Sequence, residues 1–402
     1  MGKNRPKGGF LGGFDQLRAP DAPTISVTEG DAQVSVAFTN PSDVGGGAIS
    51  SYTATAIASG VSTGATSTTS PVTITGLTNG TSYSVTGLAN NAFGASPYSD
   101  AASASPAAAI GIFMGGSNGA GSYYNTIQTI NIGTTSNASD FGDLTESKEV
   151  WDGVAGNATR SIAFGGNANG ATNVIEYVNP TSAGNGQDFG DMPVNDLNVA
   201  LAALANNTRA IYQRKEGVTV EYVTIASTGN PSDFGDATVY RRNGAAGFAS
   251  TTRGCIAGGM PASGSTLINV IDYITIGSTG NSTDFGDLTV ARYSPFGCSN
   301  ATRGLILGGE TGSGYSNVID YVTIASAGNA TDFGDLLSGV TTATACASST
   351  RGVVGGGQVT GTTQNVMQYV TIASAGNATD FGDLAANTYR FGATSTVHGG
   401  LQ

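Results

Sequence analysis

The chain has 402 residues, enough for two or three domains that each bury a core of their own. Charged residues make up only 11 % of it and glycine supplies 61 residues, a composition that favours tightly turned strands over helices. The formal net charge is −12. Such an acidic body repels phosphate backbones and anionic lipid, so nucleic acid and membrane are excluded as its expected partners.

The first twenty residues differ from the rest because they hold four of the sixteen basic residues. We expect residues 1–20 to form an extended, glycine-rich basic arm that anchors the chain to an acidic partner. The segment lacks the continuous apolar core of a secretory signal, and no stretch approaches the ~20 apolar residues of a membrane span. We therefore expect no membrane insertion, and synthesis and assembly in a cytoplasm. The candidate anchoring residues are Lys3, Arg5, Lys7, Phe10 and Phe14.

Residues 21–107 predict a β-sandwich. Short alternating segments, separated by clusters of Gly, Asn, Pro and Ser, give the rhythm of strands and turns in such a fold. The expected strands include 33–38 (QVSVAF), 52–56 (YTATA), 72–75 (VTIT) and 83–88 (YSVTGL).

This segment resembles the fibronectin type III family, through APDAPT, NPSDVGGGAISSYTATA and SPVTITGLTNGTSYSVTGLANNAFGASPYS. Tyr83 follows Leu77 by six residues, the spacing of the tyrosine corner, in which a phenol bonds back to the chain at a sheet crossing. Phe38 stands where the family usually has a core tryptophan. The resemblance implies a spacer or docking module without chemistry.

Residues 108–402 contain an internal repeat. The phrase DFGD occurs six times, at spacings of 45 to 51 residues, and a Thr-Arg pair occurs five times, followed by an apolar segment. The repeated aspartates are Asp140, Asp188, Asp233, Asp284, Asp332 and Asp380, and the repeated arginines are Arg160, Arg209, Arg253, Arg303 and Arg351.

Each repeat offers four short strands in about 48 residues, which is the content of one propeller blade. The Gly-Gly doublet and the aromatic strand after it resemble kelch repeats, although DFGDL stands where kelch repeats have a tryptophan. Residues 110–116 match the second strand of a repeat, and residues 389–397 match the first strand that should precede it. The sequence therefore predicts an all-β chain with a six-bladed, kelch-like propeller that the C-terminal strand closes.

Alternating strand direction would place the loops on two faces. The face with the Thr-Arg turns and the SAGNATD loops is nearly uniform, and we expect its arginines to pair with a DFGD aspartate or with loop carbonyls. The loops of the other face vary and include Glu146 and Lys148. Aromatic and Arg residues there predict a binding surface, since they combine large contact area with several hydrogen bonds; some of them could instead cap the core. These residues are Trp151, Tyr240, Arg241, Arg242, Arg292, Tyr293, Tyr389 and Arg390.

The sequence contains few residues of the types that catalytic sites use. His398 is the only histidine, and Cys255, Cys298 and Cys346 have no zinc-site spacing and predict buried hydrophobes. The DFGD aspartates could bind calcium or stabilise turns through Asx hydrogen bonds, and the second alternative fits their spacing better. We expect no cofactor, no metal and no catalytic residue, with a two-carboxylate polysaccharide-degrading enzyme as the remaining enzymatic alternative.

Low charge, GNATDFGDL phrases and a fibronectin-like module together resemble structural proteins of tailed bacteriophages, especially those of marine cyanobacteria. That resemblance implies a virion protein of tail, fibre or capsid, present in multiple copies. Its implied partners are other virion proteins, through residues 1–20 and the sandwich, and a host-surface glycan or receptor. The alternative is a bacterial interaction propeller or cell-surface adhesin.

Overall fold

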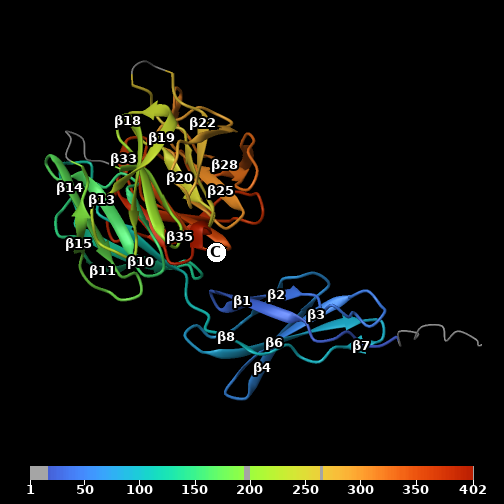
Figure 1. Cartoon of the computed structure of the whole chain (residues 1–402). Coiled ribbons are helices and arrows are strands. Elements are labelled where there is room, and N and C mark those ends of the chain that lie inside the picture. The colour runs from blue at the N-terminus through green and yellow to red at the C-terminus, as the bar shows by residue number, and fades with distance from the viewer. Residues whose placement is uncertain (1–16, 194–199, 263–265, 402) are drawn as a thin grey trace, which may run out of the picture. The chain divides into compact units, whose positions relative to one another are not determined.

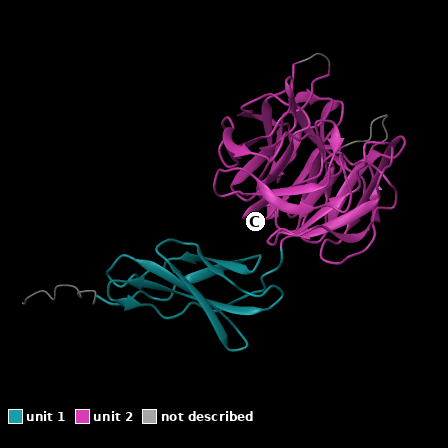
Figure 2. Cartoon of the chain, turned by 180° about the vertical axis from the view of Figure 1, so that it is seen from behind, with its two compact units in different colours: residues 1–108 teal, residues 109–402 magenta. Residues whose placement is uncertain are grey.

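The chain is an all-β protein of antiparallel sheets in the computed structural model, which describes residues 17–193, 200–262 and 266–401 (Figure 1). No α-helix occurs among these residues, which contain one turn of 3-10 helix, η1 (Gly399–Leu401). The chain divides into two compact units, residues 1–108 and 109–402, one residue from the expected boundary (Figure 2). The anchoring residues Lys3, Arg5, Lys7, Phe10 and Phe14 lie outside the described residues.

The smaller unit is a sandwich of two sheets. One sheet contains β1 (Thr24–Gly30), β2 (Gln33–Thr39) and β5 (Val72–Thr75). The other contains β3 (Ser51–Ala58), β4 (Val61–Ser67), β6 (Tyr83–Asn91), β7 (Gly94–Ala95) and β8 (Ala102–Ala104). Alternate residues of β2, β3, β5 and β6 point inward and form one apolar cluster, so the period-2 pattern of the sequence generates the core.

Two aromatic residues of this unit occupy the places that the sequence suggested. The Tyr83 hydroxyl accepts a hydrogen bond from the Thr78 main-chain nitrogen at 2.9 Å, as a tyrosine corner requires. Phe38 packs against the core, with its ring 4.8 Å from that of Tyr52.

The larger unit contains six four-stranded sheets, numbered I to VI here in chain order. Sheet I has β9 (Ile110–Met114), β10 (Thr126–Asn131), β11 (Ser139–Asp143) and β36 (Gly392–Ser395); sheet II has β12 (Val154–Gly156), β13 (Ser161–Asn167), β14 (Ala171–Val178) and β15 (Gln187–Asp191). Sheet III has β16 (Ala200–Ala205), β17 (Arg209–Arg214), β18 (Gly217–Thr224) and β19 (Ser232–Arg241); sheet IV has β20 (Ala246–Ala249), β21 (Arg253–Ala257), β22 (Val270–Thr275) and β23 (Thr283–Asp287). Sheet V has β24 (Phe296–Ser299), β25 (Arg303–Leu307), β28 (Val318–Thr323) and β29 (Thr331–Asp335); sheet VI has β30 (Thr344–Ala347), β31 (Arg351–Gly355), β34 (Val366–Thr371) and β35 (Thr379–Asp383). Two further hairpins pair β26 (Glu310–Thr311) with β27 (Gly314–Tyr315), and β32 (Gln358–Val359) with β33 (Thr362–Thr363).

The two ends of the larger unit meet in sheet I. The C-terminal strand β36 pairs with β9, from Gly392 opposite Met114 to Ser395 opposite Gly111, which is the pairing expected from the sequence. Among the described residues, six apolar clusters join sheet I to II, II to III and so on to VI, and the last joins sheet VI back to I. The core is therefore a closed cycle of inter-sheet contacts.

Candidate binding site

The five repeated arginines tie neighbouring sheets together. Each donates a hydrogen bond of 2.7–2.9 Å from Nη1 to a main-chain carbonyl of the next sheet, and each lies 4.4–4.8 Å from the ring centre of a tyrosine in its own sheet. The sequence left two kinds of partner open for these arginines, a DFGD aspartate or a loop carbonyl, and the structure has the loop carbonyls. The bonds run from Arg160 to Ile225, Arg209 to Ile276, Arg253 to Ile324, Arg303 to Ile372 and Arg351 to Gly133.

The DFGD segments also lie at sheet interfaces. Their first aspartates, Asp140, Asp188, Asp233, Asp284, Asp332 and Asp380, are exposed, while the phenylalanines that follow are buried. The main-chain nitrogen of the second aspartate donates to an asparagine Oδ1 in the next sheet at 2.9–3.1 Å, in all six segments. The intervening glycine is required by geometry: Gly286 has φ +145°, and a Cβ there would lie 2.5 Å from the Gly328 carbonyl oxygen.

Arg241 and Arg292 do not lie on the displayed surface, contrary to the expectation from sequence. Both are fully buried. Their charges are tolerated there because each forms an ion pair with a buried carboxylate of the next sheet. Arg241 Nη1 lies 2.7 Å from Asp272 Oδ2, and Arg292 Nη2 lies 2.9 Å from Asp320 Oδ2. Burial lowers the pKa of both guanidinium groups, and the paired aspartates oppose that shift.

Lys148 is buried in the same way, with Nζ 2.7 Å from Glu176 Oε1. These three cations stand five residues after the second aspartate of DFGD, at equivalent positions of three repeats. In two other repeats that position holds Val340 or Thr388, and the acceptor in the next sheet is then an uncharged glutamine, Gln368 or Gln128. In these five repeats a cation at one position accompanies a carboxylate at the other. The sixth repeat differs, since its two positions hold Asp196 and Glu221.

The other residues expected on the binding surface differ in exposure. Tyr389 is 9 % exposed and Tyr240 is half-buried. Tyr293 is half-buried and donates a hydrogen bond to Glu310, and burial together with this bond raises the pKa of its phenol. Arg242 has 53 % of its side chain exposed.

Trp151 and Arg390 meet where the chain enters the first strands of sheets II and I. Both have positive φ, 51° and 53°, a conformation that is uncommon for bulky residues and concentrates at functional sites. The Trp151 main-chain nitrogen donates to the Arg390 carbonyl at 3.2 Å. The Arg390 guanidinium lies 4.0 Å from the Trp151 ring centre and 4.8 Å from that of Tyr389, in cation–π geometry.

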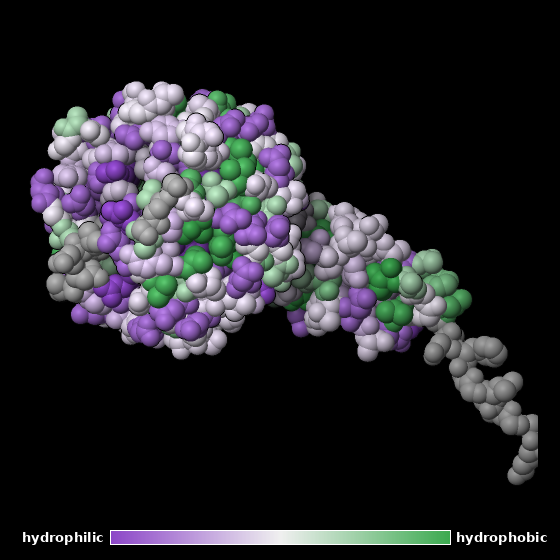
Figure 3. All heavy atoms as spheres, turned by 90° about the horizontal axis from the view of Figure 1, so that it is seen from above, coloured by the Kyte–Doolittle hydropathy of each residue, from purple (hydrophilic) through white to green (hydrophobic). Residues whose placement is uncertain are grey.

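Lys215 approaches the same indole, with Nζ 5.1 Å from the ring centre. Burial lowers the pKa of Lys215, and the positive charges of Arg390 and Arg242 lower it further, while Glu216 opposes the shift. The four side chains Trp151, Lys215, Arg242 and Arg390 thus form one group, which we call the Trp151 cluster. Figure 3 shows hydrophilic side chains over much of one face of the larger unit, with small apolar areas between them.

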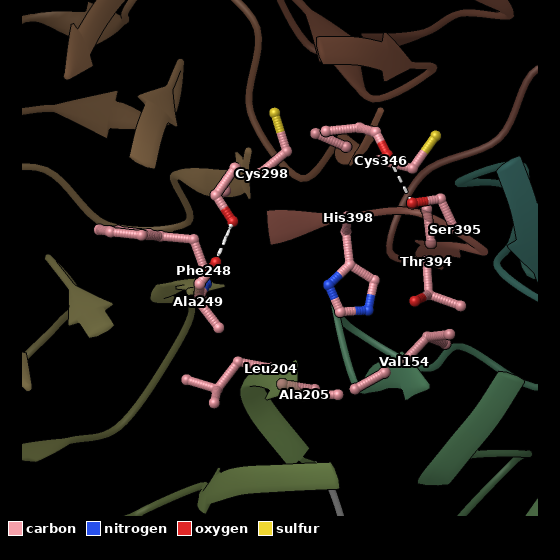
Figure 4. Close-up of a pocket in the computed structure, with 18 residues that line it drawn as sticks. Val154, Leu204, Ala205, Phe248, Ala249, Cys298, Cys346, Thr394, Ser395 and His398 are labelled. Carbon is pink, nitrogen blue, oxygen red and sulfur yellow. Dashed lines mark hydrogen bonds between the residues drawn. The ribbon is translucent and has the colours of Figure 1, made fainter. Parts of the chain in front are cut away.

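Two small cavities lie among the first strands of the six sheets. One, of about 50 Å³, is lined by residues from every sheet and by the His398 ring, which points into it (Figure 4). His398 Nε2 lies 2.7 Å from the Gly156 carbonyl oxygen, and Nδ1 accepts from the Gly400 nitrogen, so the ring is the neutral Nε2–H tautomer. Burial lowers the pKa of His398 to about 4.

The other cavity, of about 20 Å³, is also lined by residues from every sheet and includes Asp152 and Thr344. Burial raises the pKa of Asp152 to about 8, and a hydrogen bond with Thr344 opposes this shift. Asp152 follows Trp151 directly in the chain, and its carboxyl group belongs to this cavity.

Sequence reasoning missed Lys215, Asp152 and the three buried acceptors Glu176, Asp272 and Asp320. A partial signal for the acceptors was present, because in five of the six repeats an acidic acceptor occurs together with a cation five residues after DFGD and a glutamine occurs without one. Lys215 and Asp152 carry no such signal, since each occurs in a single repeat.

Within the described ranges, no group of three or more His, Cys, Asp or Glu side chains is placed to hold a metal ion. None of the described residues forms a helix long and apolar enough to cross a membrane. No protein-family model matches this chain, and the search of curated proteins gave no match.

Proposed function

We propose that the larger unit is a closed six-bladed, kelch-like propeller and the smaller one a fibronectin type III-like spacer. Three features support the closed ring: six sheets of four strands, the pairing of β36 with β9, and the cycle of six apolar clusters. The hydrogen bond from Arg351 to Gly133 joins sheet VI to sheet I in the same way as its four counterparts join consecutive sheets. Closure removes exposed strand edges, which favours a soluble display module.

We further propose that the protein is a non-enzymatic virion component that docks through residues 1–20 and displays the propeller for attachment to a host surface. One observation carries this proposal. Aromatic and cationic side chains gather in the Trp151 cluster, on loops that vary between repeats, and the ion pairs of Arg242 and Arg390 there are longer than the buried pairs of the fold. Recognition surfaces are commonly built from such residues on a rigid scaffold.

A catalytic role for the Asp152 carboxyl group is the alternative to consider, because a raised pKa is typical of catalytic acids. The carboxyl group faces a cavity of about 20 Å³, which has room for about one water molecule and none for a sugar ring. This geometry favours binding over hydrolysis.

Attachment to particles can be tested directly by deleting residues 1–20. The full chain should be found in purified particles by mass spectrometry, and the shortened chain should be missing from them while its larger unit unfolds at the same denaturant concentration. Incorporation of the shortened chain at the normal level would refute the anchor. Absence of the full chain from every particle would refute the virion assignment and favour a bacterial adhesin.

A further inference from the structure

The twelve basic residues of the larger unit divide into two groups. Five are the repeated arginines that bond to carbonyls of the next sheet, and three are the buried cations Lys148, Arg241 and Arg292. Eight of the twelve are therefore held by contacts of 2.7–2.9 Å to an acceptor of the next sheet. The other four are Arg214, Lys215, Arg242 and Arg390.

These four residues converge on one region although the chain separates them by up to 176 positions. Arg214 and Lys215 are adjacent at the β17–β18 turn, and Arg242 follows β19, the strand that pairs with β18. Lys215 and Arg390 both contact the Trp151 ring. The whole unit has 22 acidic residues against 12 basic ones, a net charge of −10, so this local concentration of cations stands out against its surroundings.

The acidic neighbours of the cluster leave it available to another anion. Arg242 lies 3.5 Å from Glu216, and Arg390 lies 3.4 Å from Glu149, distances longer than the 2.7–2.9 Å of the buried pairs. The pair of Arg242 with Glu216 is exposed, and exposed pairs contribute little stability. Glu149 is buried, so the pair of Arg390 with Glu149 belongs to the packed structure and leaves Arg242 and Lys215 as the more available cations. Nε1 of Trp151 and Nε of Arg390 are buried without a hydrogen-bond partner among the described residues, so a ligand at the surface does not reach them. The exposed guanidinium group of Arg242 supplies the accessible donors.

Two further tyrosines, Tyr293 and Tyr315, lie beyond the cations. Tyr293 donates a hydrogen bond to Glu310, which lies opposite Tyr315 in the β26–β27 hairpin. Tyr315 in turn lines an open groove between the β26–β27 and β32–β33 hairpins, together with Ser338 and Thr360. Planar rings beside hydroxyl and main-chain groups suit a sugar, whose faces are apolar and whose edges carry hydroxyls.

Resting on the proposed attachment function, we propose that the Trp151 cluster binds an acidic saccharide. Its carboxylate or sulfate group would lie against Lys215, Arg242 and Arg390, and neighbouring sugar rings would extend past Tyr293 toward the Tyr315 groove. An anion placed there would also offset the positive charges of Arg390 and Arg242 beside Lys215, whose pKa is lowered mainly by burial. An acidic peptide would satisfy the cations but would make no use of the rings and hydroxyl groups.

Calorimetric titration of the full chain can test this proposal with four probes. They are an oligogalacturonate, which carries carboxylates, a sulfated galactan oligosaccharide, a neutral galactan oligosaccharide and polyglutamate of similar length. At least one acidic saccharide should bind at least tenfold more tightly than the neutral one and than polyglutamate. The better acidic saccharide identifies whether carboxylate or sulfate is recognised.

Variants then assign the site. Lys215→Gln and Arg242→Gln should each weaken acidic-saccharide binding at least fivefold, and Tyr293→Leu should weaken it without changing its salt dependence. Arg18→Gln is the matched control, because it removes one positive charge from an exposed side chain of the other unit and should change affinity less than twofold. Near-ultraviolet circular dichroism shows that each variant is folded.

Three results would overturn the inference: no binding of either acidic saccharide, equal binding of polyglutamate, or equal weakening by Arg18→Gln. The attachment function is separable from this outcome. If the protein is present in particles but does not bind acidic saccharides, the virion proposal stands and the proposed ligand is wrong. If it binds acidic saccharides but is absent from particles, the ligand stands and the virion proposal is wrong.

Discussion

Removing one member of the buried Arg292–Asp320 pair should destabilise the larger unit strongly. Both side chains are fully buried, with Nη2 and Oδ2 2.9 Å apart, and Thr289 also donates to the same carboxylate. Either Arg292→Val or Asp320→Gln leaves a buried group without its partner, which costs about 3–5 kcal/mol. We expect each single variant to lower the free energy of unfolding by that amount.

The double variant should recover most of the loss. At the next interface the chain itself places Val340 and Gln368 at the equivalent positions, and the Leu337 nitrogen donates to Gln368 Oε1 at 2.8 Å. Combining Arg292→Val with Asp320→Gln copies this arrangement, so its net cost should be about 1 kcal/mol, and the coupling energy of the two changes should be several kcal/mol. Replacing a buried ion pair as a whole is often nearly neutral.

Guanidinium unfolding followed by tryptophan fluorescence measures these effects, because the single tryptophan, Trp151, belongs to the larger unit. Arg242→Gln serves as the control, since it breaks an exposed pair and should cost less than about 1 kcal/mol. If the two single costs simply add in the double variant, the correspondence between the charged and uncharged interfaces is wrong.

Three further changes test other parts of the fold. Gly286→Ala should cost about 2–3 kcal/mol more than Gly170→Ala in the same unfolding assay, because both glycines have φ near +150° but only a Cβ at Gly286 meets main-chain atoms; equal costs would contradict the close approach. His398 has a folded pKa of about 4, below its ordinary 6.5, so its neutral form favours the folded state. Wild type should therefore lose about 3 kcal/mol relative to His398→Gln as the pH falls from 7 to 4, and parallel pH profiles would refute this. Asp152 has a folded pKa of about 8, so its charged form disfavours folding. Asp152→Asn should be more stable than wild type by a few kcal/mol at pH 9 and of similar stability at pH 4, and the same stability difference at both pH values would show that the carboxyl group is well solvated.

Much of the architecture could be predicted from the sequence, because its signals are local or repeated. Alternation of apolar and polar residues marks strands such as β5, whose bounds Val72–Thr75 equal the predicted segment. The recurrence of DFGD indicates equivalent sheets. The matches of residues 389–397 and 110–116 to the first and second strands of a repeat predicted that the two ends of the region share one sheet. These predictions need only the comparison of one segment with another.

The candidate site depended on tertiary structure. Arg241 and Arg242 are neighbours in the chain, yet one is fully buried and the other has 53 % of its side chain exposed. The difference arises because Asp272, 31 residues away in the next sheet, meets the first guanidinium and not the second.

The sequence by itself determined the repeat, the strands and the joining of its ends, since each follows from local pattern or from likeness between segments. Only the tertiary structure decided which cations are buried in ion pairs and which stay partly exposed. Burial and ion pairing depend on partners from another sheet, and the positions of those partners are fixed only when the sheets pack together. For the same reason the meeting of Lys215 and Arg390 at Trp151 became visible only in the folded chain.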